Sequence, residues 1–153
     1  MSQPKVSIVV PIYNLEQYVP RCLDALVNQT LEDIEILCVN DGSKDSAPQI
    51  IEDYKSRYPN KVKTFHKENG GEWSARTYGL KEATGEYVGF IDSDDVPELT
   101  WAEKLYTAAK ENDADIAFSG YDRVDLDTGK TVSTEMTQHG KMNKEVDWND
   151  DFI

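Results

Sequence analysis

The sequence predicts an α/β protein in which a mainly parallel central sheet is covered by helices on both faces. Short β-branched runs, each stopped by a turn signal, alternate along the chain with stretches whose apolar residues recur at helical spacing. Connections of this length call for right-handed crossovers, which place successive strands parallel. The 153 residues are enough for one domain with a substantial core and too few for a second complete one.

The first half of the chain is predicted to form two strand and helix pairs. Residues 6–10 are a β-branched run that Pro11 ends, and residues 34–39 are a second apolar run that ends in a loop. Residues 18–27, between the two runs, carry apolar side chains at helical spacing, and residues 50–58 do so again. These elements give the order strand, helix, strand, helix.

The same alternation continues through the middle of the chain. Val62–His66 is a third, shorter strand, and residues 73–84 form a helix for which Gly85 is the expected C-cap. An apolar run over 87–91 is the fourth strand, and residues 99–112 form the next helix.

The last third of the chain has a different pattern. Residues 115–120 are predicted to open another strand, and residues 126–132 have the turn residues of a hairpin. Residues 137–153 have little periodicity and resemble the start of a further element. We therefore expect the chain to be part of a longer protein.

The charge of the chain excludes some partners. The formal net charge is −13 and no block of Lys or Arg is present, which argues against nucleic-acid binding and against docking on an anionic membrane. No run approaches the ~20 apolar residues that span a bilayer, and the first residues lack a secretory signal pattern.

Cys22 and Cys38, the two cysteines, are expected in a helix and in a buried strand. This placement suits small core residues rather than a disulfide framework or a zinc site. We therefore expect a reduced cytoplasmic compartment, with any membrane association coming from parts outside this chain.

The acidic cluster Asp92-Ser93-Asp94-Asp95 is the most informative motif, because it directly follows the fourth apolar run. Open α/β sheets bind ligands at the carboxyl ends of their strands, where a hard cation could bridge carboxylates to a diphosphate. Two other Asp-x-Asp tripeptides, at 113–115 and 125–127, do not follow such a run. The alternative is a solvated acidic turn that caps the next helix.

Polar residues also follow the first two strands, at Tyr13-Asn14 and at Asp41-Gly42-Ser43. In a parallel sheet these loops and the acidic cluster lie at the same edge. Tyr13 could stack on a base, Asp41 could accept hydrogen bonds from a base or ribose, and Asp94 could hold a cation on two phosphates. Taken singly, these residues also suit ordinary strand ends and turns, as does Asn69-Gly70-Gly71.

The ordered set of motifs resembles family 2 glycosyltransferases over residues ~5 to 120. The matching segments are residues 6–14 ending in Pro11-Ile12-Tyr13-Asn14, Val39-Asn40-Asp41-Gly42-Ser43, Asn69-Gly70-Gly71 with Ser74-Ala75-Arg76 and Gly79-Leu80, and Phe90-Ile91-Asp92-Ser93-Asp94-Asp95. The resemblance implies a Rossmann-like GT-A fold and transfer of a sugar, with inversion, from a nucleotide donor that is usually a UDP-sugar. The acceptor would be a glycan or a lipid-linked molecule in polysaccharide or glycoconjugate biosynthesis.

The resemblance also implies roles for individual residues. Pro11, Tyr13 and Asp41 would line the base and ribose pocket, and Arg76 would support the nucleotide. Asp92 would face the ribose, and Asp94, with Asp92, would coordinate Mn²⁺ or Mg²⁺ on the diphosphate. The full expected nucleotide-binding set is Pro11, Tyr13, Asn14, Asp41, Arg76, Asp92 and Ser93.

The chain departs from the family pattern at three places. Glu72-Trp73 follows the glycine pair, Thr77 stands where Asn is usual, and Val96-Pro97 follows the acidic cluster in place of an aromatic residue. These departures leave open the aim of Arg76 and the wall on the acceptor side.

The catalytic base is not identified by the sequence. An inverting transfer needs a carboxylate across the sugar from the diphosphate. Asp150 and Asp151 are the only late pair, and we expect the base beyond Ile153 instead. No role is assigned to His66 or His139.

Two organisational expectations follow. Residues 1–120 would be the donor-binding core and 121–153 the start of an acceptor-side region.

The competing hypothesis for the function is a nucleotide-sugar binding module without catalysis. A sugar nucleotidyltransferase is disfavoured because its Gly-rich basic loop is missing, and neither the dinucleotide nor the P-loop glycine motif occurs.

Overall fold

The computed structural model describes residues 3–125 and 128–135. The chain divides into two compact units, Met1–Ala117 and Phe118–Ile153, which are described separately. None of the helices among the described residues is long and apolar enough to cross a membrane.

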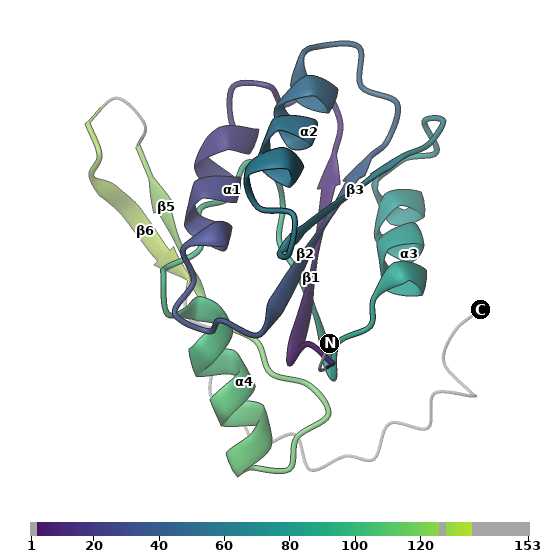
Figure 1. The fold of residues 1–153 in the computed structure, drawn as a ribbon. Helices are drawn as coiled ribbons and strands as arrows, with labels where there is room; N and C mark the ends of the chain where they lie inside the picture. The colour runs from purple at the N-terminus through teal and green to yellow at the C-terminus, as the bar shows by residue number, and fades with distance from the viewer. Residues whose placement is uncertain (1–2, 126–127, 136–153) are drawn as a thin grey trace, which may run out of the picture. The chain divides into compact units, whose positions relative to one another are not determined.

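The first unit alternates strands and helices along the chain (Figure 1). Its elements are β1 (Val6–Ile12), α1 (Val19–Val27), β2 (Ile34–Asn40), α2 (Ala47–Arg57), β3 (Val62–His66), α3 (Glu72–Glu82), β4 (Tyr87–Phe90) and α4 (Trp101–Glu111). The sheet has the order β3-β2-β1-β4, and every described pairing in it is parallel. The predicted parallel α/β sheet is confirmed.

Alternation of side chains along β1 divides the core between the two faces of the sheet. Ile8 and Val10 are fully buried in a large apolar cluster with residues of α1, α2 and α4. Val9, between them, points to the other face and packs in a second cluster that includes Ala75 of α3. Helices therefore cover both faces, as predicted, and Figure 1 shows α3 apart from α1 and α2.

The first strand runs further than the sequence predicts. The sequence predicts that Pro11 stops it, but Pro11 pairs with Val39 and the strand continues to Ile12. On its other side β1 pairs with β4 only as far as Val9 with Phe90. Pro11 therefore lies beyond the β4 ladder, at a position where a residue without an N–H can be accommodated.

The prediction that Gly85 is the C-cap of a helix is wrong. Helix α3 ends at Glu82, and Ala83 is already extended. Gly85 instead packs against β1, where its N–H donates to Ser7 Oγ at 2.8 Å. A Cβ at this position would lie 2.6 Å from the Ser7 nitrogen, so close approach of two backbones requires the glycine.

The predicted strand over 115–120 is also wrong, since none of these residues lies in a strand. Ile116 and Phe118 alternate as a strand would require, but both side chains are exposed. No described strand pairs with this segment, and an apolar alternation without a sheet to join does not form a strand.

The second unit contains the predicted hairpin. Strands β5 (Tyr121–Val124) and β6 (Thr131–Glu135) pair antiparallel, and Gly129 in the turn has φ +65°. Glycine is the residue that adopts this conformation without strain. The expectations for residues 137–153, including His139, Asp150 and Asp151, lie outside the described residues.

Candidate functional site

Asp41 lies at the carboxyl end of β2, with 2% of its surface exposed. Its carboxylate accepts a hydrogen bond from Lys67 Nζ at 2.5 Å and from the backbone N–H groups of Gly70 and Gly71, at 3.0 and 2.8 Å. Burial raises the pKa of Asp41, but these donors outweigh it, with Lys67 first, and the net pKa is lowered. Asp41 is therefore an ionised, fixed group.

The loop after β1 is fastened to the loop after β2. The Asn14 N–H donates to Ser43 Oγ at 3.1 Å, and Asn14 Oδ1 accepts from the Lys44 N–H at 2.7 Å. Asn14 has φ +53°, a conformation that asparagine tolerates better than most residues. These contacts hold the segment that carries Tyr13, a residue that is 47% exposed.

The acidic loop after β4 is ordered by α3. Arg76 donates a hydrogen bond from Nη2 to Asp92 Oδ1 and another from Nε to Glu72 at 2.9 Å. The Asp95 N–H closes a turn onto the Asp92 carbonyl oxygen. Burial, followed by the charges of Asp94 and Asp92, raises the pKa of Asp95.

The alternative interpretation of this loop, as a cap of the following helix, does not match the structure. Helix α4 begins at Trp101, and its N-cap residue Thr100 makes no side-chain cap hydrogen bond. The acidic loop instead faces a cleft. Below it, Cys22 donates a weak hydrogen bond from Sγ to the Asp92 carbonyl oxygen at 3.6 Å.

A cleft of about 490 Å³ opens at the carboxyl edge of the sheet. Of the residues predicted from the sequence, six line it: Pro11, Tyr13, Asp41, Asp92, Ser93 and Asp94. Ser93 is 1% exposed, and its hydroxyl is a buried polar atom without a hydrogen-bond partner among the described residues. Such an atom is expected to be satisfied by a ligand or water.

Two predicted residues do not line this cleft. Asn14 borders a neighbouring hollow of about 300 Å³ that Glu16 and Asp45 also line. Arg76 acts behind the wall of the cleft, through Asp92. The sequence analysis also missed one residue of the site, Lys67, which is the cationic partner of Asp41. A single Lys before Asn69-Gly70-Gly71 belongs to no recognisable motif.

The donor set of the cleft fits a hard divalent cation in chemistry but does not complete its shell. Carboxylate oxygens are the ligands that Mn²⁺ and Mg²⁺ take in proteins, and Asp92 and Asp94 supply them. Among residues 3–125 and 128–135, no group of three or more His, Cys, Asp or Glu side chains could hold a metal. Phosphate or water oxygens would have to supply the remaining ligands.

The described residues of the other two Asp-x-Asp motifs have different surroundings. Asp113 has φ +49° at the end of α4, and neither it nor Asp115 borders the cleft. Asp125 belongs to the hairpin turn, where its carboxylate accepts from the Thr128 N–H at 2.7 Å. Position after a strand of the parallel sheet is thus what distinguishes Asp92-Ser93-Asp94 from the motif at 113–115.

This geometry defines an α/β protein with a ligand cleft where several parallel strands end, the arrangement typical of nucleotide-binding folds. The family model for glycosyl transferase family 2 matches residues 7–152. The chain belongs to this family, and its fold is of the GT-A type.

Several curated relatives are similar over most of this chain. EpsH and the uncharacterized glycosyltransferase EpsJ, both of Bacillus subtilis (strain 168), are 41% identical over 138 residues and 39% identical over 141 residues. These matches cover 90% and 92% of this chain but 40% and 41% of the relatives. A poly(ribitol-phosphate) beta-glucosyltransferase of Bacillus spizizenii is 45% identical over 73% of this chain and 18% of its own length.

Solved structures of glycosyltransferases are also similar to this chain. S. aureus TarS in complex with UDP has a TM-score of 0.64 and 34% identity, covering 70% of this chain and 32% of that chain. The mannosyltransferase PcManGT of Pyrobaculum calidifontis, in complex with GDP-Man and Mn²⁺, has a TM-score of 0.63 and 26% identity, covering 81% of this chain and 36% of that one. The chain thus spans about two fifths of its first curated relatives and a third of these structures.

Proposed function

We propose that this chain is the donor-binding part of an inverting glycosyltransferase that takes its sugar from a UDP-sugar with the help of Mn²⁺ or Mg²⁺. The observation that carries the proposal is the cleft itself. It has a buried, ionised Asp41 on one side and the carboxylates of Asp92 and Asp94 on the other. The acceptor would be a glycan or a lipid-linked molecule.

The choice of donor is supported by what similar proteins bind. TarS structures carry UDP and UDP-GlcNAc, at 34% and 36% identity to this chain. PcManGT carries GDP-Man with Mn²⁺, at 26% identity. We assign a uridine nucleotide here because the more similar of these proteins bind it.

Each residue of the cleft has a defined part in the proposal. Tyr13, exposed at the cleft, stacks on the base, and the remaining acceptor capacity of Asp41 takes a base or ribose donor. Asp92 faces the ribose, and the unpartnered hydroxyl of Ser93 bonds the nucleotide. Pro11 and Asn14 shape the loop, and Arg76 keeps Asp92 in position.

The cation would be held by Asp94 with Asp92 and would neutralise charge on the departing diphosphate. The residues of the chain prepare that step by binding and orienting the donor. The carboxylate that accepts the proton of the acceptor is proposed to lie beyond Ile153, in the part of the relatives that this chain does not cover. Residues 1–120 are the proposed donor core, and 121–153 the start of the acceptor side.

The biological setting is proposed from relatives at 45% and 41% identity, a poly(ribitol-phosphate) beta-glucosyltransferase and a minor teichoic acid biosynthesis protein. We propose that the product is a surface polysaccharide or a related glycoconjugate. The transfer would take place on the cytoplasmic side, with any membrane attachment outside this chain. A nucleotide-sugar binding module without catalysis is the second candidate, because the chain covers 40% of EpsH.

Calorimetric titration of UDP into the wild-type chain and into Asp94→Ala, each with and without Mn²⁺, tests the proposal. We expect binding that needs both the metal and Asp94. The matched control is Asp115→Ala, which removes the last carboxylate of an Asp-x-Asp outside the cleft and should bind as the wild type does. Equal binding by Asp94→Ala, or no binding by the folded wild type, contradicts the proposal.

Metal-dependent hydrolysis of the donor separates the two candidates. Slow release of sugar from a UDP-sugar requires activation of the glycosidic bond as well as binding. Its presence in the wild type and loss in Asp94→Ala supports the transferase, whereas binding without hydrolysis supports the binding module.

A further inference from the structure

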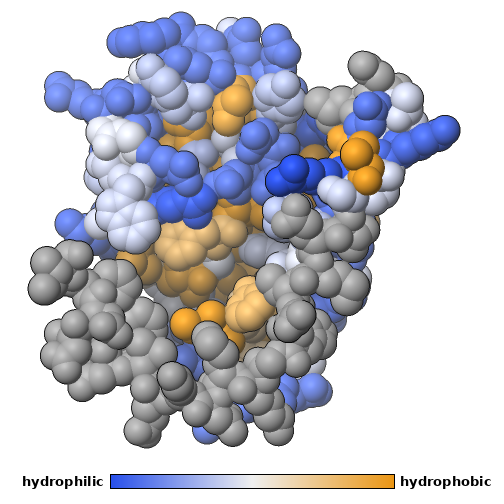
Figure 2. Space-filling model, turned by 180° about the vertical axis from the view of Figure 1, so that it is seen from behind, coloured by the Kyte–Doolittle hydropathy of each residue, from blue (hydrophilic) through white to orange (hydrophobic). Residues whose placement is uncertain are grey.

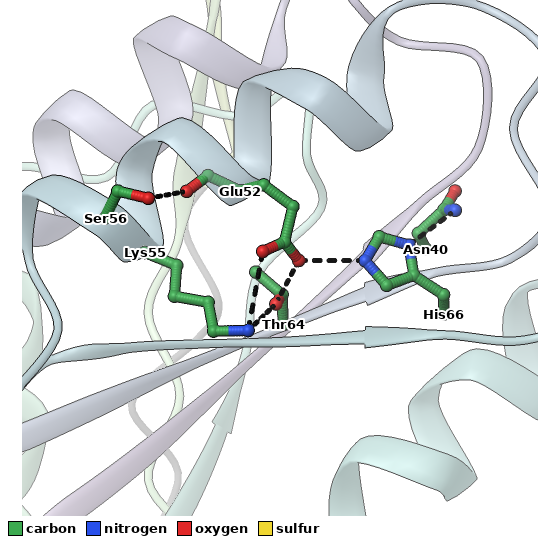
Figure 3. Close-up of polar contacts among 6 residues, drawn as sticks. All are labelled: Asn40, Glu52, Lys55, Ser56, Thr64 and His66. Carbon is green, nitrogen blue, oxygen red and sulfur yellow. Dashed lines mark hydrogen bonds and ion pairs between the residues drawn. The ribbon is translucent and has the colours of Figure 1, made fainter.

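A hydrogen-bond network of polar side chains runs from α2 across β3 to the end of β2 (Figure 3). Glu52 Oε1 accepts from Thr64 Oγ1 at 2.5 Å and lies 2.9 Å from His66 Nε2. The other ring nitrogen, His66 Nδ1, lies 3.2 Å from Asn40 Nδ2. Asn40 and His66 are register partners on neighbouring strands, and Asn40 directly precedes Asp41 in the cleft.

The backbone N–H of Ser43 determines where the protons of this hydrogen-bond network lie. The Ser43 N–H donates to Asn40 Oδ1 at 3.0 Å, and a backbone N–H can only donate. The amide oxygen of Asn40 must therefore face Ser43, and its NH₂ group must face His66. Since that NH₂ group also only donates, His66 Nδ1 has to accept, and Nε2 carries the proton that is donated to Glu52.

A second proton on His66 is incompatible with this arrangement. It would sit on Nδ1 and point at the NH₂ group of Asn40. Asn40 is 5% exposed and cannot turn to water, so its amide would have to rotate and give up the Ser43 N–H. His66 itself is 44% exposed, so solvent can deliver the proton, and histidine is the side chain that ionises in mildly acidic solution.

Ser43 connects this hydrogen-bond network to the cleft. It stands two residues after Asp41, and its hydroxyl accepts from the N–H of Asn14, the residue after Tyr13. Release of the Ser43 N–H from Asn40 therefore loosens the loop of Asp41 and the loop of Tyr13 together. Both loops line the cleft.

We propose that Glu52, His66 and Asn40 form a positioning relay: with His66 neutral it holds loop 41–43 in its nucleotide-binding shape, and protonation of His66 weakens nucleotide binding. The relay rests on the proposed function, because its effect is read at the same cleft. None of the three side chains borders that cleft, so they act through Ser43.

Charged groups surround His66 on two sides. The hydrogen bond from Thr64, then that from His66, lowers the pKa of Glu52 to about 2, so Glu52 stays ionised. Lys55, on the same helix as Glu52, has its Nζ 3.4 Å from Glu52 and 3.0 Å from Thr64. Lys67, which follows His66, forms an ion pair with Asp41, with Nζ 2.5 Å from Oδ1.

The test is the affinity for UDP over a pH series, in the wild type and in His66→Gln, which cannot ionise. We expect the wild type to lose about tenfold in affinity relative to His66→Gln on acidification from neutral to mildly acidic pH, the size of one hydrogen bond to a buried group. The ratio of the two affinities cancels the titration of the diphosphate itself. His139→Gln is the matched control and should follow the wild type.

Two further variants distinguish a relay from a structural role. In Asn40→Asp the carboxylate accepts from the Ser43 N–H and from a doubly protonated His66, so acidification should no longer weaken binding. Glu52→Gln can still accept from His66 Nε2 through its amide oxygen, so UDP binding at neutral pH should stay at the wild-type level. Parallel profiles in the wild type and His66→Gln overturn the relay.

The ligand-free chain supplies a second readout that does not depend on nucleotide binding. The backbone amide resonance of Ser43 should move with pH in the wild type and stay fixed in His66→Gln. If UDP fails to bind at every pH, the proposed function fails, and this resonance still decides the relay. A Ser43 resonance that moves equally in both proteins overturns it.

Discussion

Arg76 and Asp92 tie helix α3 to the acidic loop after β4. The guanidinium donates to Asp92 Oδ1, pairs with Glu72 at 2.8 Å, and lies 5.6 Å from the centre of the Phe90 ring. The contact joins two segments 16 positions apart in sequence, and it orients a carboxylate that lines the cleft. Asp92 is therefore positioned before any ligand arrives.

Replacement of Arg76 should weaken nucleotide binding. Arg76→Ala leaves Asp92 without its cation, and we expect a loss of about 1.5–3 kcal/mol in UDP affinity, the range for a hydrogen bond to a charged group. Arg76→Lys keeps the charge but cannot bond Asp92 and Glu72 with one planar group, so its loss should be intermediate. Calorimetric titration measures both. Arg21→Ala, an exposed site on α1, is the control, and an Arg76→Ala chain that binds as tightly as this control would contradict the assignment.

Tyr13 should contribute to binding through its ring rather than its hydroxyl. It is exposed at the cleft, as expected for a stacking platform. Tyr13→Phe should keep the UDP affinity, and Tyr13→Ala should lose about 1–3 kcal/mol, the usual value for one stacked base. Uridine in place of UDP should show the same loss, because the effect is on the base. A larger effect of Tyr13→Phe than expected would mean that the hydroxyl bonds the ligand instead.

Most of the fold could be predicted because burial leaves a direct mark on sequence. The strands β1 and β2 are buried at every position, and most of their residues are β-branched or aliphatic. The errors concern features that depend on distant partners. Gly85 is required by the Ser7 backbone of β1, 78 positions away, and the residues around Ile116 lack a described strand to pair with.

Some residues of the site could likewise be predicted from the sequence, and others could not. Residues in the loops after parallel strands, such as Asp41 after β2 and Asp94 after β4, could be placed at one edge from topology alone. Lys67 could not, because its pairing with Asp41 depends on the path of the loop around Gly70. Neither could the hydrogen bonding of His66, which follows from a strand register that the sequence does not specify.

The molecule also presents apolar side chains on its surface. Figure 2 shows orange side chains beside blue ones on the face opposite to that of Figure 1. Trp73 and Leu80 of α3 and Phe90 of β4 are among the large apolar side chains that remain exposed. Exposed apolar residues of this kind are normal on a folded protein, so they identify no partner by themselves.

Gly79 should be required for the packing of α3 on the sheet. A Cβ at this position would lie 2.4 Å from Cγ1 of Val9, a fully buried residue of β1 whose β-branched side chain has few alternative rotamers. Gly79→Ala should therefore lower the free energy of unfolding by about 1–3 kcal/mol, although alanine favours helix by about 1 kcal/mol. Urea unfolding measures the change. In the double variant with Val9→Ala the added methyl has space, so its cost should largely disappear. Additive losses would contradict the contact.

Glu35 should make the fold sensitive to acid. Its buried carboxylate accepts from Ser7 Oγ at 2.5 Å, from the Thr84 N–H at 2.8 Å and from Lys63 at 2.6 Å. Burial raises its pKa, but these bonds, with Lys63 first, lower it from 4.5 to about 2.

Because the folded state holds the proton more weakly than the unfolded chain, this contribution to stability is complete above pH 4.5 and is lost as the pH falls toward about 2. Glu35→Gln should be less stable than the wild type at neutral pH, and the difference should shrink across that window. Urea unfolding at a series of pH values measures it, with the exposed Glu32→Gln as the control. A stability difference that stays constant from neutral to acidic pH would show that the charge of Glu35 does not contribute, because only an ionised group gives a contribution that acid removes.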